Sequence, residues 1–296
     1  MDTVFDMQSL MWITCGVLAL CICAMILFGT KGSLFVMCDV GNGDALYIRT
    51  SNQLDILIDF GSREDVLDCL GRYMPFMDRT IELAFVSHQH EDHYGGLRYV
   101  LRKYHIQKLV LPDGTGTSKQ YLDLVDTAKK KGTQTMSIHE LINSRSRVRL
   151  SDKESLSCLY PDSIELPAIR KQEKSDENAF SPICVYSQGS QDILLTGDAT
   201  PRALSQIIKQ DLLASYGHIE LMKVPHHGSK IGLTEEFLAY VNPTIALISV
   251  ARDKSYGHPS PEVIGMLTRH NVDTFLTSRD SDVVLKITPD GTFSAQ

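Results

Sequence analysis

Four side chains of the kinds that bind metal ions occur together in the segment Ser87-His-Gln-His-Glu-Asp-His-Tyr-Gly-Gly96. They are His88, His90, Asp92 and His93, and they directly follow the apolar run 83–87. A tight turn after a strand splays alternate side chains, so one pair can face one metal ion and the other pair a second. Imidazole and carboxylate ligands suit zinc, iron or manganese. The alternative, a polar surface loop rich in histidine, is disfavoured because few short segments combine so many ligands with a preceding strand.

Asp198 ends a second apolar run, Leu194-Leu-Thr-Gly-Asp198. A carboxylate at the end of a strand can bridge two cations and hold them about 3.5–4 Å apart, as in two-metal hydrolases. The same aspartate would serve as the N-cap of a helix that begins near Thr200-Pro201. The bridging role is favoured here because the first motif already supplies ligands for two cations.

A third motif, Lys223-Val-Pro-His-His-Gly-Ser229, also follows an apolar run. One of His226 and His227 is expected to complete a metal shell, and the other to orient a ligand or the substrate. The spacing does not distinguish the two roles.

A fourth motif, Tyr256-Gly-His-Pro-Ser260, follows Arg252 and Lys254. His258 is a candidate to donate a proton or a hydrogen bond to a substrate oxygen. A structural role for this loop histidine is an equal alternative. Lys230, Arg252 and Lys254 lie close in sequence to these motifs and are candidates to bind the oxygens of an anionic substrate.

The elements that must position these motifs begin with short β-rich runs and continue as alternating strands and helices. Strands are expected at 34–40, 45–50, 54–60, 83–87, 106–111, 156–160, 182–187, 191–196, 219–224, 244–250, 272–276 and 282–288. Helices are expected at 65–73, 95–104, 118–131, 201–215, 234–241 and 260–270. This order predicts mixed sheets covered by helices, with the motifs at strand ends. The polar stretch 169–180 is expected to form an exposed loop.

The chain carries a net charge of −7. This charge argues against long duplex nucleic acid as a partner, because proteins that hold it usually present a basic face. Two local basic runs, Lys129-Lys130-Lys131 and the alternate Arg145, Arg147 and Arg149, are interpreted as a solvated helix end and the outer face of a strand.

The nineteen residues Leu10–Phe28 carry no charge. As a helix they would span about 28 Å, close to the thickness of the hydrocarbon core of a bilayer. The segment lacks the basic start and the cleavage site of a secretory signal, so it is interpreted as a single membrane anchor. A buried core helix is the alternative. Lys31 favours a cytoplasmic catalytic domain, although one lysine leaves the topology open.

Cysteine usage leaves the compartment open. Three of the seven cysteines lie in the apolar run. The other four, Cys38, Cys69, Cys158 and Cys184, are scattered and are interpreted as small buried hydrophobic residues.

The motifs taken together resemble a known family. HxHxDH with Gly-Gly, then TGD, then HHGS, in this order, is similar to the metallo-β-lactamase superfamily. Three further segments resemble the hydrolase domain of the ComEC/Rec2 DNA-uptake proteins and their stand-alone relatives: Asp39-Val-Gly-Asn-Gly-Asp44, Glu177-Asn178 and Tyr256-Gly-His-Pro259. The resemblance covers roughly residues 33–290. It implies an α+β protein with an αββα sandwich, two divalent metal ions, and Asn178 and Tyr256 as substrate-binding residues.

The chain departs from these families at several positions. Asn42 stands where the group usually has Gln, and Lys254 stands near its usual Asn. Asn178 occupies the region of the third histidine of zinc β-lactamases, which argues against antibiotic hydrolysis. The many transmembrane helices of a DNA channel are also missing from this sequence. Asp39 and Asp44 are expected to orient the metal-binding loops or to shape a glycine-rich turn.

These features predict a hydrolase domain over 33–296, preceded by a head at 1–9 and a single-pass membrane anchor at 10–29. Two divalent ions, Zn²⁺ first and Mn²⁺ or Fe²⁺ as alternatives, would supply a water that is activated at neutral pH. Asp92, His258 and Lys230 would assist catalysis on a phosphodiester or other anionic substrate. Two alternatives stay open: the same site acting on an ester, thioester, lactam or cell-envelope polymer, and an inactive membrane-anchored binding protein.

Overall fold

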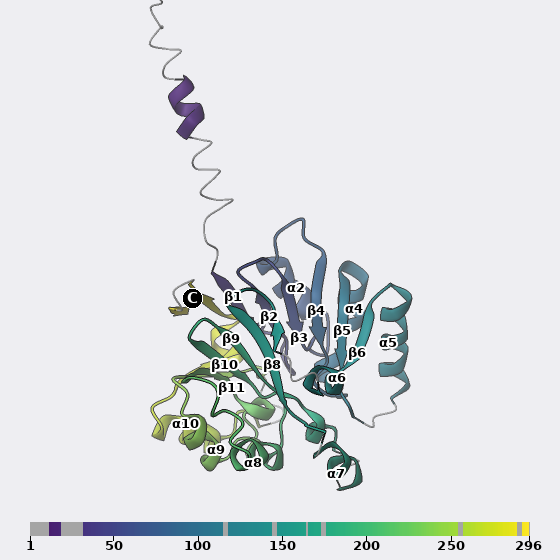
Figure 1. The fold of residues 1–296 in the computed structure, drawn as a ribbon, viewed down its shortest axis with the longest axis vertical. Helices are drawn as coiled ribbons and strands as arrows, with labels where there is room; N and C mark the ends of the chain where they lie inside the picture. The colour runs from purple at the N-terminus through teal and green to yellow at the C-terminus, as the bar shows by residue number, and fades with distance from the viewer. Residues whose placement is uncertain are drawn as a thin grey trace, which may run out of the picture.

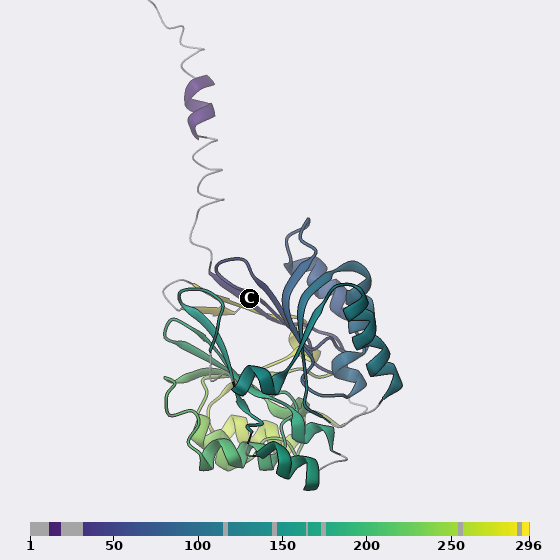
Figure 2. The same ribbon diagram turned by 45° about the vertical axis from the view of Figure 1, so that its right-hand side comes forward.

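The computed structural model describes residues 12–18, 32–114, 118–143, 147–163, 165–172, 176–253, 257–288 and 292–295. From residue 32 onward these residues form two β-sheets that face each other (Figure 1). Helices cover the outer face of each sheet, as Figure 2 shows from a second direction. The expected sandwich of two mixed sheets between helical layers is therefore confirmed.

The first sheet has the strand order β15-β14-β1-β2-β3-β4-β5-β6. Its strands are β1 Ser33–Met37, β2 Leu46–Arg49, β3 Asp55–Ile58, β4 Thr80–Phe85, β5 His105–Leu111, β6 Gln134–Ser137, β14 Val283–Ile287 and β15 Phe293–Ala295. β3 to β6 run parallel to one another, whereas β15, β14, β1, β2 and β3 pair as antiparallel neighbours. Strands β3 to β6 therefore end at one edge of the sheet.

The second sheet has the order β13-β12-β11-β10-β9-β8-β7. Its strands are β7 Val148–Arg149, β8 Glu154–Tyr160, β9 Ile183–Gln188, β10 Gln191–Leu195, β11 Ile219–Lys223, β12 Ile245–Ile248 and β13 Asp273–Leu276. β10 to β13 are parallel, and their carboxyl ends also meet at one edge.

The helices are α2 Asp65–Tyr73, α3 Glu91–Tyr94, α4 Leu97–Lys103, α5 Lys119–Lys130, α6 Ile138–Asn143, α7 Glu165–Gln172, α8 Pro201–Lys209, α9 Glu235–Val241, α10 Pro261–Arg269 and α11 Thr277–Asp280. There are also two 3-10 turns in the described residues, η1 Glu177–Phe180 before β9 and η2 Pro225–Gly228 after β11. Helix α8 begins where the side chain of Thr200 accepts a hydrogen bond from the backbone N–H of Ala203. Thr200 is thus the N-cap, and the alternative cap role for Asp198 is wrong.

Three apolar clusters hold the layers together. Between the sheets the fully buried side chains include Phe35, Ile48, Ile56 and Tyr186. A second cluster packs the first sheet against α2, α4 and α5, and a third packs the second sheet against α7 to α10. Because both faces of each sheet are buried, the strands are almost continuously apolar.

Two sequence interpretations need correction. The stretch 169–180 is not a continuous loop: it contains the end of α7, in which Leu166 and Ile169 are buried, and the turn η1, whereas 173–175 lie outside the described residues. Of the four scattered cysteines, Cys38, Cys69 and Cys184 are buried and Cys158 is partly buried, and all four form disulfides, Cys38 with Cys69 and Cys158 with Cys184. Sequence spacing cannot reveal which cysteines meet in space.

The predicted membrane anchor falls mostly outside the described residues. Residues 12–18 are helical, with Trp12 74% exposed. None of the helices in the described ranges has both the length and the apolar composition needed to cross a bilayer.

Candidate metal centre

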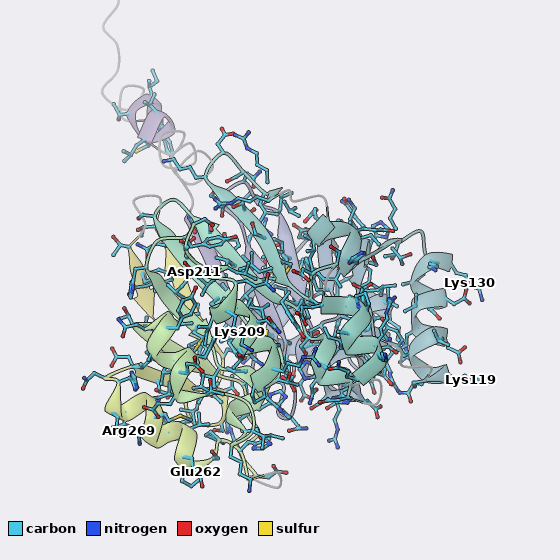
Figure 3. The ribbon with its side chains drawn as sticks, turned by 60° about the horizontal axis from the view of Figure 1, so that its bottom comes forward. Lys119, Lys130, Lys209, Asp211, Glu262 and Arg269 are labelled. Carbon is cyan, nitrogen blue, oxygen red and sulfur yellow. A yellow bond between two sulfur atoms is a disulfide. The ribbon has the colours of Figure 1, made fainter. Side chains whose placement is uncertain are left out.

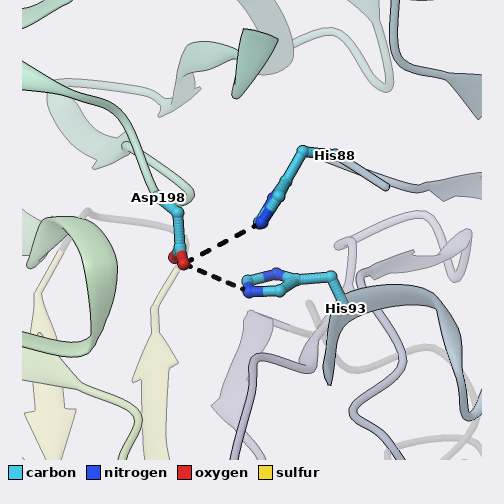
Figure 4. A group of neighbouring side chains, drawn as sticks. All are labelled: His88, His93 and Asp198. Carbon is cyan, nitrogen blue, oxygen red and sulfur yellow. Dashed lines mark ion pairs between the residues drawn. The ribbon is translucent and has the colours of Figure 1, made fainter. Parts of the chain in front are cut away.

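The carboxylate of Asp198 faces a group of imidazoles at the edge where the strands end. Its Oδ2 lies 4.0 Å from His88 Nε2 and 3.4 Å from His93 Nε2 (Figure 4). The same oxygen lies 3.3 Å from His227 Nε2 and 4.0 Å from His226 Nε2. Side chains that follow β4, β10 and β11 are therefore brought to one point.

The remaining residues of the first motif extend this cluster on two sides. His90 Nδ1 lies 3.0 Å from His88 Nε2, and Asp92 Oδ2 lies 3.8 Å from His227 Nε2. Among the described residues, four groups of three have ligand atoms within 4.8 Å of one another, and two of these, His88/His93/Asp198 and Asp92/His93/His227, consist of predicted ligands and share His93. Two overlapping ligand groups are the arrangement that a pair of cations needs.

Each buried imidazole makes a polar contact through its Nδ1 on the side of the ring that faces away from Asp198. His93 Nδ1 donates to Asp59 Oδ2 at 2.8 Å, and His227 Nδ1 donates to the backbone oxygen of Ser249 at 3.0 Å. His88 Nδ1 contacts the hydroxyl of Ser87 at 3.0 Å. These contacts fix the ring so that the opposite nitrogen, Nε2, faces the cluster.

The Nε2 atoms of His93 and His227 are buried and face Asp198 Oδ2 at 3.4 and 3.3 Å, without forming a hydrogen bond of good geometry to any described residue. A buried polar atom without a partner is costly. A metal-binding histidine is held in the same way, with one ring nitrogen bonded to a carboxylate or carbonyl and the other left for the metal. The residues present therefore fit divalent metal ions.

The electrostatics of the cluster favour cations at its centre. Burial alone would lower the pKa of His93, yet Asp198 and Asp59 outweigh it and raise that pKa well above the usual range. Burial likewise opposes protonation of His227, but Asp198 and Asp44 raise its pKa to about 10. Burial and the neighbouring His93 hold the pKa of His88 well below its usual value. The buried carboxylates thus attract positive charge to the imidazoles around them.

A buried lysine accompanies these carboxylates. Lys223 Nζ lies 2.5 Å from Asp44 Oδ2 and 3.4 Å from Asp198 Oδ1, and it donates to the backbone oxygen of Gly197 at 2.6 Å. Burial alone would raise the pKa of both Asp198 and Asp44. The positive charges of the nearby histidines and of Lys223 instead hold the pKa of Asp198 well below its usual range. Lys223 and His227 lower the pKa of Asp44 to about 2. Both acids are therefore charged at neutral pH.

The turn η2 determines how the two adjacent histidines differ. His226 and His227 both have left-handed backbone angles, with φ of 51° and 52°. Such angles are uncommon for residues other than glycine and occur where a functional geometry requires them. The turn buries His227 within the cluster but leaves the His226 side chain 23% exposed, with its ring 6.0 Å from that of His258.

The glycine-rich segment 39–44 packs against Asp92. Asn42 Nδ2 donates to Asp92 Oδ2 at 3.3 Å, so the residue that departs from the family pattern still contacts a predicted ligand. A side chain at Gly43 would overlap the backbone oxygen of Asp92 at 1.8 Å. Asp39 contacts none of the cluster residues: its Oδ1 accepts from the Gly41 N–H at 3.4 Å. Asp44 orients the cluster, whereas Asp39 shapes the turn.

The predicted substrate residues are only partly gathered. Arg252 pairs with Asp39 at 3.3 Å, and Lys230 is exposed beyond η2 without a contact to the cluster. His258 lies beside His226, and burial together with the charge of His227 lowers its pKa. Asn178 lies in η1 with a buried Oδ1 that has no described hydrogen-bond partner. Lys254 and Tyr256 lie outside the described residues.

A cleft of about 870 Å³ opens beside Asp92. Both basic and acidic side chains line it, among them Arg63, Arg98, Asp65, Glu91 and Asp253. Asp92, whose side chain is 26% exposed, therefore joins the buried cluster to a space that a substrate can enter.

Asp59, Ser249 and Lys223 were missed as functional residues by the sequence analysis. Asp59 had a usable signal, because it follows the apolar residues Ile56-Leu57-Ile58 much as Asp198 follows the apolar run that begins at Leu194. Its φ of 61° also marks a strained strand end. Ser249 acts through its backbone oxygen, which no sequence pattern reveals.

Comparisons with known proteins agree with this geometry. Residues 38–252 match the Metallo-beta-lactamase superfamily, which is more than half of the 296-residue chain. ComE operon protein 3 of Bacillus subtilis is 25% identical over 266 residues, covering 83% of this chain and 32% of its own length. Recombination protein 2 of Haemophilus influenzae is 27% identical over 237 residues, covering 78% of this chain and 26% of its own length. The chain thus spans only about a third or less of these two relatives.

Solved structures show the same fold at low sequence identity. CmlA beta-hydroxylase matches with a TM-score of 0.53 and 11% identity, over 86% of this chain and 54% of its own. Zn²⁺-bound PqqB from Methylobacterium extorquens matches with a TM-score of 0.51 and 7% identity, over 82% of this chain and 97% of its own.

Proposed function

Because the chain belongs to the metallo-beta-lactamase superfamily, we propose that it is a metal-dependent hydrolase that cleaves phosphodiester bonds. The observation that carries this proposal is the common orientation of three buried imidazoles. His88, His93 and His227 are each held at Nδ1 and each present Nε2 to one carboxylate oxygen of Asp198.

We assign His88 and His90 to one cation and Asp92, His93 and His227 to the other, with Asp198 between them. His227 is chosen over His226 because its Nε2 lies near both Asp198 and Asp92. Two divalent ions, with Zn²⁺ as the first candidate, would lower the pKa of a bound water and stabilise negative charge that develops on the substrate.

The protein side chains in this proposal position the metal ligands and bind the substrate. The amide of Asn42 positions Asp92, and the carboxylate of Asp59 positions His93. His226 and His258 lie together at the rim, where they can donate hydrogen bonds to substrate oxygens. Arg63 in the adjoining cleft and Lys230 beyond η2 are the cations assigned to an anionic substrate, since Arg98 in the same cleft is paired with Glu91 at 3.4 Å.

The choice of a phosphodiester rests on the relatives. One is named a recombination protein, which connects its family to nucleic acids. The net charge of −7 directs the proposal toward single strands, nucleotides or small phosphodiesters rather than long duplexes. We also propose that the apolar residues 10–28 attach the chain to a membrane.

The test is hydrolysis of bis(p-nitrophenyl) phosphate by the full chain in detergent, with Zn²⁺ or Mn²⁺ added after chelation. We expect metal-dependent turnover, reduced about 10²-fold or more in Asp92→Asn because that change removes a charged ligand from the cleft side of the cluster. Turnover of esters or thioesters alone, by a folded and metal-loaded protein, would replace the phosphodiester assignment. A folded chain that binds no metal would leave a binding protein as the remaining function.

Asp59→Asn tests whether the hydrogen bond from His93 to Asp59 contributes to metal affinity. Asp59 is 1% exposed and bonds both His93 and the hydroxyl of Ser87. Loss of its charge weakens the hold on His93, so we expect metal affinity to fall about 10- to 100-fold. Competition with a chromophoric chelator measures this affinity. Unchanged affinity in a folded variant would show that His93 does not bind metal through this arrangement.

A further inference from the structure

The eight-stranded sheet has a second end, opposite the metal centre, at which β1, β3, β4, β5 and β6 begin. Exposed basic side chains gather there and are called the basic end: Arg79, Lys103, Lys129, Lys130 and Lys131. Each lies within five residues of the first residue of β4, β5 or β6. These five cations give this end of the domain a local positive charge although the net charge of the chain is −7.

The members of the basic end come from neighbouring elements. The backbone N–H of His105, which begins β5, donates to the backbone oxygen of Arg79 at 2.7 Å, so the starts of β4 and β5 are joined. β6 pairs with β5, and Lys129 and Lys130 end the helix that precedes β6. Figure 3 shows Lys130 at the opposite end of α5 from Lys119. Of these cations, only Lys130 has a described ion pair, with Asp126 at 2.5 Å.

Two large apolar side chains project from the loop between α2 and β4 at this end. Phe76 and Met77 are each 84% exposed, the highest values among the exposed large apolar residues of the described chain. Asp78, the next residue, lies 3.4 Å from the guanidinium of Arg49, which is the cross-strand partner of Leu34 in β1. The apolar tip is therefore beside the start of β1.

The apolar sequence that precedes β1 indicates the kind of partner that contacts the basic end and the residues Phe76 and Met77. Leu10–Phe28 contains no charged residue, and β1 begins at Ser33. An apolar run of this length, which we have proposed attaches the chain to a membrane, thus joins the domain within a few residues of the start of β1. Figure 1 shows β1 and the start of β4 at the same end of the domain.

Exposed apolar side chains at the same end of a domain as lysines and arginines suit the boundary between lipid headgroups and acyl chains. The apolar residues enter the interface, and the cations attract anionic headgroups. We propose that the basic end, with Phe76 and Met77, is the surface by which the domain lies on an anionic lipid bilayer. This inference rests on the proposed membrane attachment. The metal centre at the opposite end then faces away from the bilayer, toward the aqueous phase.

The test places a fluorescent reporter on the loop of the full chain. In a background in which Cys15, Cys21 and Cys23 are replaced with alanine, Met77→Cys is labelled with an environment-sensitive dye. Ile231→Cys is the matched control, because Ile231 is 63% exposed and follows η2 at the metal end. Both chains are reconstituted in phosphatidylcholine vesicles, with and without phosphatidylserine, and the dye is quenched with a nitroxide placed just below the headgroups.

We expect quenching of the Met77→Cys label at least about two-fold greater than that of the Ile231→Cys label, and greater still when phosphatidylserine is present. Charge reversal of Lys129, Lys130 and Lys131 to glutamate should remove the effect of phosphatidylserine. Circular dichroism confirms that each variant is folded.

Three results overturn the inference in distinguishable ways. A chain that floats with vesicles but quenches equally at both labels retains the membrane attachment and loses the docking surface. A chain that does not float loses both. Protection of the Met77→Cys label by a single-stranded oligonucleotide, without quenching by lipid nitroxide, would assign the basic end to nucleic acid instead.

Discussion

Asp198→Asn is expected to lower metal-dependent turnover on the order of 10³-fold. Asp198 Oδ2 faces the imidazoles of His88, His93 and His227, so a neutral amide removes the negative charge that these ligands share. Asparagine nearly preserves the shape of the side chain, so the loss comes from charge and coordination. Under the assignment above, Asp198 is the residue between both cations, and its removal weakens both sites at once.

The measurement pairs kcat/KM with the metal content of the dialysed protein. We expect Asp198→Asn to retain at most one equivalent of metal, whereas the unaltered chain retains two. Asp152→Asn is the matched control, because the Asp152 side chain is 96% exposed on a turn away from the cluster. It should keep both metals and full turnover. An Asp198→Asn protein that keeps both metals and turns over normally would remove Asp198 from the site.

The elements were predictable because their apolar patterns are regular. Helix α2 occurs at Asp65–Tyr73, the predicted bounds, since Val66, Cys69 and Leu70 form one buried face. Helix α8 ends at Lys209, before the predicted 215, because the chain after it turns through Asp211, whose φ is 48°. Short strands such as β7, with two residues, carry too little pattern to be found.

The ligand motifs were predictable because each follows an apolar strand directly, and parallel strands bring their carboxyl ends to one edge. The residues that support the ligands were predictable only in part. Asp59 follows an apolar strand as the ligand motifs do, whereas Lys223 has the composition of an ordinary strand end, and only the packing of the two sheets brings it against Asp44 in the loop between β1 and β2. The two disulfides, which join cysteines 31 and 26 residues apart, depend on the same long-range packing.

The position of Lys223 leads to the second large prediction, which concerns stability. Lys223 is 3% exposed, and its ammonium group lies between the buried carboxylates of Asp44 and Asp198. Burial alone would lower the pKa of Lys223, but these two carboxylates raise it, so the lysine stays charged at neutral pH. Lys223→Met would leave both carboxylates buried without this cation.

We expect Lys223→Met to lower the free energy of unfolding of the metal-free protein by about 3–5 kcal/mol, as when one partner of a buried ion pair is removed. The melting temperature should fall by about 10 °C. Lys209→Met is the matched control, because Lys209 is exposed at the end of α8 (Figure 3), and it should leave the melting temperature unchanged.

Adding metal to Lys223→Met distinguishes two causes of its lower stability, the loss of the positive charge of Lys223 and the loss of its packing. Added Zn²⁺ would supply positive charge beside Asp198, so it should raise the melting temperature of Lys223→Met more than that of the unaltered chain. Asp44→Asn combined with Lys223→Met should also be more stable than Lys223→Met alone, because it removes the other unpaired charge. Suppose that Zn²⁺ raises the melting temperature of both chains equally and that the double variant is no more stable than Lys223→Met. Lys223 would then stabilise the protein through the packing of its aliphatic side chain. The lysine would then have no part in balancing the charge of the metal centre.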